Sequence, residues 1–204
     1  MTEAAITITP GSGLDLHGNS RTITATTKVD QYVLMGEFAY ASYVALAAGI
    51  SIATTDSHVI QLCAGASLNV RVRSIRIEQN ANATTASSSQ LSLYRLSTAG
   101  TGGGSVTPRP YDTADSASGA TAMTLPSSKG TESLELFRIA MNWRQTIATT
   151  GTQSDDSWQW TQHPGMKPII IAAGTSNGLA LKALSGIAGC TVNVIIEFVE
   201  TAYV

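Results

Sequence analysis

Four glycines between positions 100 and 104 are the residues that most suggest a ligand-binding loop. They follow a strand-like run in YRLSTAGTGGGSVTPRPYD (residues 94–112), and Arg109 comes after them between two prolines. A phosphate cradle needs glycines at fixed spacing and then a helix whose first amides face the anion. Here Ser105 or Thr107 replaces the last glycine of G-x-G-x-x-G, no G-K-[S/T] follows, and the prolines oppose a helix start. We therefore interpret the glycines as a flexible exit from a strand.

The histidines and cysteines lack the spacing of a metal site. His17, His58 and His163 have no second ligand at i+2 or i+4, and Cys63 and Cys190 form no C-x-x-C pair. No histidine is associated with a G-x-S-x-G nucleophile elbow. We expect both cysteines to pack as small buried hydrophobic residues. The acidic pairs are interpreted as solvated loop carboxylates: Asp112 with Asp115, and Asp155 with Asp156. We expect no catalytic residue, no cofactor and no metal ion, and we predict that the protein is not an enzyme.

Arginines and tryptophans are the candidate interface residues. Arg71 and Arg73 share one face of a predicted strand, close to Arg76. They could form a strip that binds a polyanion, but we favour ion pairs with acids such as Glu78 or with acids of an adjacent subunit. Tryptophans in SWQWTQ alternate onto one strand face, which favours a core or a subunit interface over stacking on a sugar. The interface candidates are Arg71, Arg73, Arg109, Trp158 and Trp160.

The composition is poor in charge. Only 13% of the 204 residues are charged and the formal net charge is -2, whereas an average soluble domain has about 25% charged residues. Such a surface is weakly protected against association, which suits a protein covered by copies of itself or by a larger assembly. The balance argues against direct nucleic-acid binding, which needs excess Lys and Arg. We find no leader peptide, and the apolar run at 43–52 is too short to cross a bilayer, so we expect no membrane partner.

Alternating apolar residues predict many short strands and an all-β fold. CTVNVIIEFVE (190–200) is the clearest strand, and TESLELFRIAMNWR (131–144) fits a strand with one slip. In LNVRVRSIRIEQ (68–79) the apolar phase slips by one, so we predict a β-bulge near Arg73 and Ser74. The other predicted strands are YASYVAL, HVIQLC, QLSLYRL, SWQWTQ, PIIIAA and GLALKAL. Short strands with turn signals between them predict a two-sheet antiparallel sandwich of jelly-roll type.

Two regions differ from this pattern. Residues 1–37 contain the short β-prone pieces AITIT and RTITATT but little apolar content, so we predict an extended N-terminal arm that contacts another subunit or the larger assembly that the protein joins. The second region is a long loop at 97–132, rich in small residues. Residues 38–204 are predicted to form the sandwich.

From residue 68 to residue 200 the chain resembles the jelly-roll head decoration, or cement, proteins of tailed bacteriophages. The resemblance lies in segment order and composition: RVRSIRIEQ, QLSLYRLSTAGTGGGSVTPRPYD, SASGATAMTLPSSKGTE, WTQHPGMKPIIIAAGTSNGLALK and VNVIIEFVE. It implies a non-enzymatic virion structural protein that is made in the host cytoplasm and located on the outer surface of the phage head. The implied partners are two further copies in a homotrimer and the major capsid protein, whose subunit contacts it stabilises. The alternative is the receptor-binding head domain of a phage tail fibre or spike.

Overall fold

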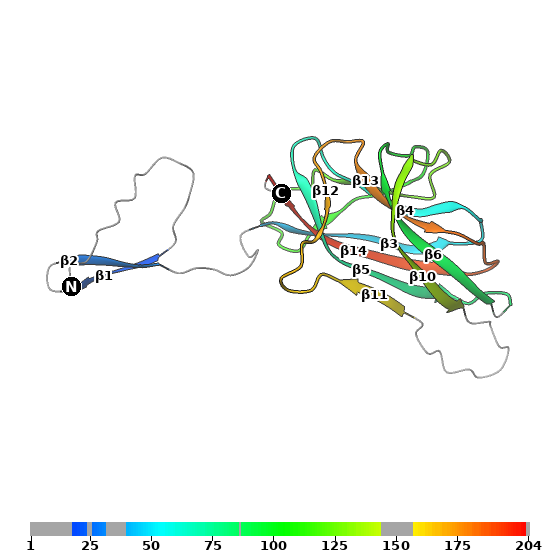
Figure 1. Cartoon of the computed structure of the whole chain (residues 1–204), viewed down its shortest axis with the longest axis horizontal. Helices are drawn as coiled ribbons and strands as arrows, with labels where there is room; N and C mark the ends of the chain where they lie inside the picture. The colour runs from blue at the N-terminus through cyan, green and yellow to red at the C-terminus, as the bar shows by residue number, and fades with distance from the viewer. Residues whose placement is uncertain (1–17, 24–25, 32–39, 86, 144–156, 203–204) are drawn as a thin grey trace. The chain divides into compact units, whose positions relative to one another are not determined.

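The chain divides into two units, residues 1–39 and 40–204. The computed structural model describes residues 18–23, 26–31, 40–85, 87–143 and 157–202. In the first unit β1 (Gly18–Ile23) pairs antiparallel with β2 (Thr26–Gln31), as Figure 1 shows in blue. The predicted piece RTITATT therefore contributes residues to both of these paired strands. The piece AITIT lies outside the described residues.

The second unit is an all-β sandwich of two antiparallel sheets, as predicted (Figure 1). The first, here called the β4 sheet, has the spatial order β10 (Glu132–Trp143), β6 (Ser87–Leu96), β13 (Gly178–Ala183), β4 (Ser57–Cys63), β9 (Thr121–Thr124) and β7 (Gly104–Val106). The second, the β3 sheet, has the order β11 (Ser157–Thr161), β5 (Asn69–Ala81), β14 (Thr191–Thr201), β3 (Ser42–Ser51) and β8 (Arg109–Pro110). A further strand, β12 (Ile169–Ile171), also pairs with β5. The described residues include no helix that could span a membrane.

Residue alternation builds the core between the sheets. In β14 the side chains of Val192, Val194, Ile196 and Phe198 are buried, while the residues between them are partly exposed. Successive side chains of a strand point to opposite faces, so these four face the other sheet. All the predicted strands of residues 40–204 overlap strands of the structure.

The predicted β-bulge in β5 is confirmed. Glu197 pairs with Ser74 but the next residue, Phe198, pairs with Val72, so Arg73 is the extra residue. Val72 and Ile75 are consequently both buried in the core although they are three residues apart. The strand β10 has two irregularities against β6, between Glu132 and Leu134 and between Glu135 and Phe137, where the sequence indicated one slip.

The segment 97–132 is more ordered than the predicted loop. It contains β7, β8 and β9; β9 pairs with β4, β7 pairs with β9, and β8 pairs with β3. Both sheets are therefore extended at the same side of the sandwich. These strands have two to four residues, too few for an alternation pattern to emerge from the sequence.

Candidate functional site

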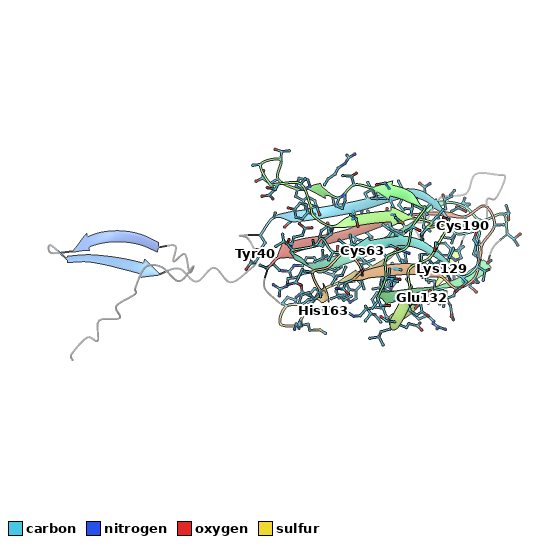
Figure 2. All side chains as sticks on the ribbon, turned by 90° about the horizontal axis from the view of Figure 1, so that it is seen from above. Tyr40, Cys63, Lys129, Glu132, His163 and Cys190 are labelled. Atoms are coloured by element: carbon cyan, nitrogen blue, oxygen red, sulfur yellow. The ribbon has the colours of Figure 1, made fainter. Side chains whose placement is uncertain are left out.

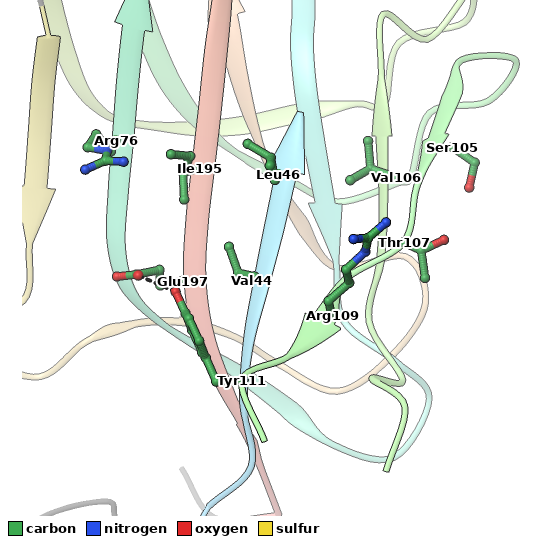
Figure 3. A pocket seen from close by; sticks show the side chains of 10 residues that line it. All are labelled: Val44, Leu46, Arg76, Ser105, Val106, Thr107, Arg109, Tyr111, Ile195 and Glu197. Carbon is green, nitrogen blue, oxygen red and sulfur yellow. Dashed lines mark hydrogen bonds between the residues drawn. The ribbon is translucent and has the colours of Figure 1, made fainter. Parts of the chain in front are cut away.

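The outer face of the β3 sheet carries a groove of about 690 Å³. Figure 3 shows the side chains that line it, which come from β3, β5, β14 and the segment from β7 to just past β8. Its lining residues are Val44, Leu46, Arg76, Ser105, Val106, Thr107, Arg109, Tyr111, Ile195 and Glu197. We call this surface the β3 groove.

The floor of the β3 groove is apolar because alternation places hydrophobic residues on the outer as well as the inner face. Val44 and Leu46 alternate with buried Ala45 and Ala47 along β3. Leu46 is opposite Ile195 of β14 in the strand register, and the Leu46 side chain is 54% exposed. Neighbouring apolar side chains left in water favour the association of a partner that covers them.

Polar and charged side chains form the rim of the β3 groove. Glu197 accepts hydrogen bonds from the hydroxyls of Ser74 and Tyr111, and these bonds lower the pKa of the Glu197 carboxyl. Partial desolvation of the Tyr111 hydroxyl, together with its hydrogen bond to Glu197, raises the pKa of Tyr111 to about 12. Arg76 forms an ion pair with Glu78 at 3.0 Å between Nε and Oε1. Arg109 is exposed and has no ion pair with any residue that the structure describes. The groove thus offers an apolar floor and one available cation.

A second polar cluster lies on the β4 sheet and is almost fully paired within itself. Lys182 Nζ lies 3.0 Å from Glu132 Oε2 and 2.5 Å from Asp56 Oδ1, and Lys129 Nζ lies 2.5 Å from Asp56 Oδ2. Figure 2 shows Lys129 and Glu132 close together, at a distance from His163. The hydrogen bonds from Lys129 and Lys182 lower the pKa of Asp56 to about 2. Because these charges neutralise one another, we assign the cluster a role in stability.

His58 connects this charge cluster to the glycine-rich segment. Its ring is buried. The ring nitrogen Nε2 lies 2.9 Å from Glu132 Oε1, and Nδ1 lies 2.6 Å from the side-chain Nε2 of Gln61. The main-chain N–H of Gly100 donates to Gln61 Oε1 at 2.8 Å, so the Gln61 NH₂ group faces the histidine. Nδ1 is then an acceptor, and the neutral ring carries its proton on Nε2, which donates to Glu132. Burial lowers the pKa of His58, although Glu132 opposes this shift.

The glycines of the opening motif lie close to atoms of neighbouring segments, which explains their residue type. A Cβ on Gly100 would lie 2.6 Å from Gln61 Nε2 and 2.7 Å from the carbonyl oxygen of Ser128. A Cβ on Gly103 would lie 2.3 Å from the carbonyl oxygen of Thr124. Glycine permits this close approach, and the segment packs on the outside of the β4 sheet. The interpretation as a strand exit agrees with the end of β6 at Leu96. The sequence suggested that glycines occur here because the strand exit is flexible. The close contacts account for the glycines without such flexibility.

The structure separates the predicted interface residues. Arg109 lines the β3 groove. Arg71 and Arg73 lie on the outer face of β5, half-buried, and the Arg73 guanidinium donates to Gln162 Oε1. The predicted ion pair with Glu78 is confirmed for Arg76. Trp158 and Trp160 pack against the core, with the Trp158 ring 5.2 Å from Phe137 of the opposite sheet. Trp158 therefore joins β11 to β10 across the edge of the sandwich.

The remaining predictions concern cysteines, histidines and acids. Cys63 and Cys190 are free and buried, as expected, and burial raises the pKa of the Cys190 thiol to about 11. His163 is exposed. No group of three metal-ligating side chains occurs within the described ranges. His17 and the pair Asp155–Asp156 lie outside them.

Sequence reasoning missed most of the β3 groove. Its apolar floor comes from β3 and β14, and Tyr111 comes from the segment that was predicted to be a loop. One signal was present: Ile195 is an apolar residue in the otherwise polar series Thr191, Asn193 and Glu197.

Comparison of the chain with protein-family models, with curated proteins and with solved structures gives no match.

Proposed function

We propose that the protein is a non-enzymatic structural protein of a bacteriophage virion, which binds the outer surface of the head as a decoration protein and stabilises contacts between major capsid subunits. The observation that carries the proposal is the β3 groove, an apolar surface that is left open on a sandwich with few charges. Leu46 and Tyr111 are 54% and 59% exposed in it. Apolar surface of this kind is typical of a site that another protein covers.

The strand order supports a jelly-roll type of sandwich, which is the fold that the resemblance implies. Strands near the two ends of the sandwich sequence pair with each other, and strands closer to its middle pair inside them. The pairs are β3 with β14, β4 with β13, β5 with β11 and β12, and β6 with β10. Such nesting is what results when one long hairpin is rolled into two sheets. In this arrangement β7, β8 and β9 belong to the connection between β6 and β10.

The charge distribution supports a protein that works by surface contact. Charged residues make up only 13% of the chain, and many of them pair with one another, as in Arg138 with Glu135 and Lys129 with Asp56. Little charge then remains to keep copies of the protein apart. This favours association with further copies, for which we propose a homotrimer, and with the major capsid protein.

Binding to particles tests the proposal. The purified full chain is mixed with empty heads assembled from the major capsid protein of the same genome, and the heads are sedimented. We expect the protein to sediment with the heads at a fixed stoichiometry and to raise their resistance to heat. Failure to bind heads, together with saturable binding to a glycan, would contradict the proposal and favour the receptor-binding alternative.

A further inference from the structure

The strand β3 has an edge that is only partly covered. On one side it pairs with β14 along nearly its whole length, from Ser42 to Ser51. On the other side β8 covers only two residues, Tyr43 and Val44. Beyond Val44, no described strand pairs with this side of β3.

The direction of the free backbone groups follows from the alternation of a strand. The carbonyl oxygen of Ser42 accepts from the N–H of Tyr111, just past β8, so it points to the partly covered side. Every second residue of a strand directs its N–H and C=O to the same side. The N–H and C=O of Leu46 therefore also point to that side, past the end of β8. A polar edge and the apolar Leu46 side chain are thus presented together beside the β3 groove.

Such a surface fits an extended peptide segment better than a helix or a small molecule. Strand addition satisfies the free backbone groups, and side chains at alternate positions enter the adjoining apolar surface. A fitting segment has no charge over five or six residues and has apolar side chains at every second position. The volume of about 690 Å³ lies in the range of sites for ligands of drug or short-peptide size.

Residues 4–9 of this chain, with the sequence AAITIT, have that chemistry. In a strand Ala4, Ile6 and Ile8 would share one face, because side chains alternate between the two faces, and the segment carries no charge. Pro10 follows and cannot donate to a ladder, so a paired strand would stop before it. We propose that residues 4–9 of a second copy add as a strand to the free edge of β3, with Ile6 and Ile8 over Leu46 in the β3 groove. The inference rests on the proposed function for its second copy, since a decoration protein is expected to form oligomers.

The test measures self-association of full-length variants by sedimentation equilibrium. Lysine at position 46 or 6 would place a charge in the apolar contact, so Leu46→Lys and Ile6→Lys should each weaken association by tenfold or more, about the effect of 1.4 kcal/mol. Leu134→Lys is the matched control, since Leu134 of β10 is 56% exposed and lies on the other sheet. Thr7→Lys is the control within the segment, because Thr7 falls on the opposite face. Both controls should associate as the unmodified chain does.

A second readout is specific to strand pairing. Hydrogen exchange of the Leu46 main-chain amide should be slow in the associated protein and fast in Ile6→Lys, while the amides of β14 stay protected in both, which also shows that the variant is folded. A wild-type chain that is monomeric, or Leu46→Lys and Ile6→Lys chains that associate normally, would overturn the inference. If Leu46→Lys loses head binding but not self-association, strand addition is wrong and the capsid role stands.

Discussion

His58 is buried between a carboxylate and an amide, and this position should make stability depend on pH. Its pKa in the folded protein is below the ordinary value of 6.5. As pH falls below that value, the unfolded chain therefore binds the proton more readily than the folded one, and stability is lost. Protonation of Nδ1 would also set two donors, the ring N–H and the Gln61 NH₂, against each other.

We predict that the free energy of unfolding falls as pH is lowered from 7.5 to 5.5, with a slope of at most about 1.4 kcal/mol per pH unit from this residue. Urea unfolding at several pH values measures it. His58→Gln should flatten the slope, because the group whose pKa is lowered in the folded protein is then absent. Asp56, with a pKa of about 2, and Glu132, with a lowered pKa, lose their stabilising effect only at more acidic pH. An unchanged slope in His58→Gln would show that His58 is not the titrating group.

Gly103 offers a second prediction at the level of one residue. Gly103→Ala should lower the free energy of unfolding by about 1–3 kcal/mol. The Cβ of the alanine would overlap the carbonyl oxygen of Thr124, and a main-chain atom in a paired strand cannot move aside easily. Gly119→Ala is the control, because its Cβ would have no neighbour closer than 3.9 Å. Denaturant unfolding of both variants decides the matter. Equal stability would mean that the segment does not pack on β9 as closely as described.

At the level of elements, Glu200 near the end of β14 accepts hydrogen bonds from the segment that connects β8 to β9. Its carboxylate accepts from Ser118 Oγ at 2.7 Å and from the main-chain N–H groups of Gly119 and Ala120 at 3.1 and 2.7 Å. Glu200→Gln replaces one charged acceptor oxygen by a donor that faces these N–H groups. We expect a loss of about 1–3 kcal/mol in the free energy of unfolding.

The matched control for Glu200→Gln is Glu78→Gln, since Glu78 forms a half-exposed ion pair with Arg76. It should change stability by less than about 0.5 kcal/mol. Thermal or chemical unfolding compares the two variants. A Glu200→Gln protein as stable as Glu78→Gln would show that the carboxylate does not hold the connection.

The long strands could be predicted from the sequence, whereas the short strands and most of the β3 groove could not. Alternation predicted the long strands and the bulge at Arg73, because a strand with one buried face repeats every two residues. It missed β7, β8 and β9, which have only two to four residues each and pair with the strands beside them. It missed the β3 groove for a related reason, since residues such as Leu46 and Tyr111 come together only when separate strands pair. Of the interface candidates, Arg109 lies in the groove, while Trp158 and Trp160 are partly buried and pack against the core.

At the level of the whole molecule, the division into two units predicts that the sandwich folds without the first unit. Deletion of residues 1–39 should leave a β-rich circular dichroism spectrum and a cooperative thermal transition, because the hydrophobic core formed by the described residues lies within residues 40–204. The truncated chain should lose self-association, as the strand-addition proposal requires. Loss of the cooperative transition would show that the first unit is needed for folding.

We propose that the protein covers and stabilises a phage head. Electron cryo-microscopy of heads assembled with and without the full chain tests this proposal. We expect added density on the outer surface, at symmetry-related positions across the contacts between capsid subunits, into which a two-sheet sandwich fits. Heads with no added density at saturating protein, or density on the tail alone, would contradict it.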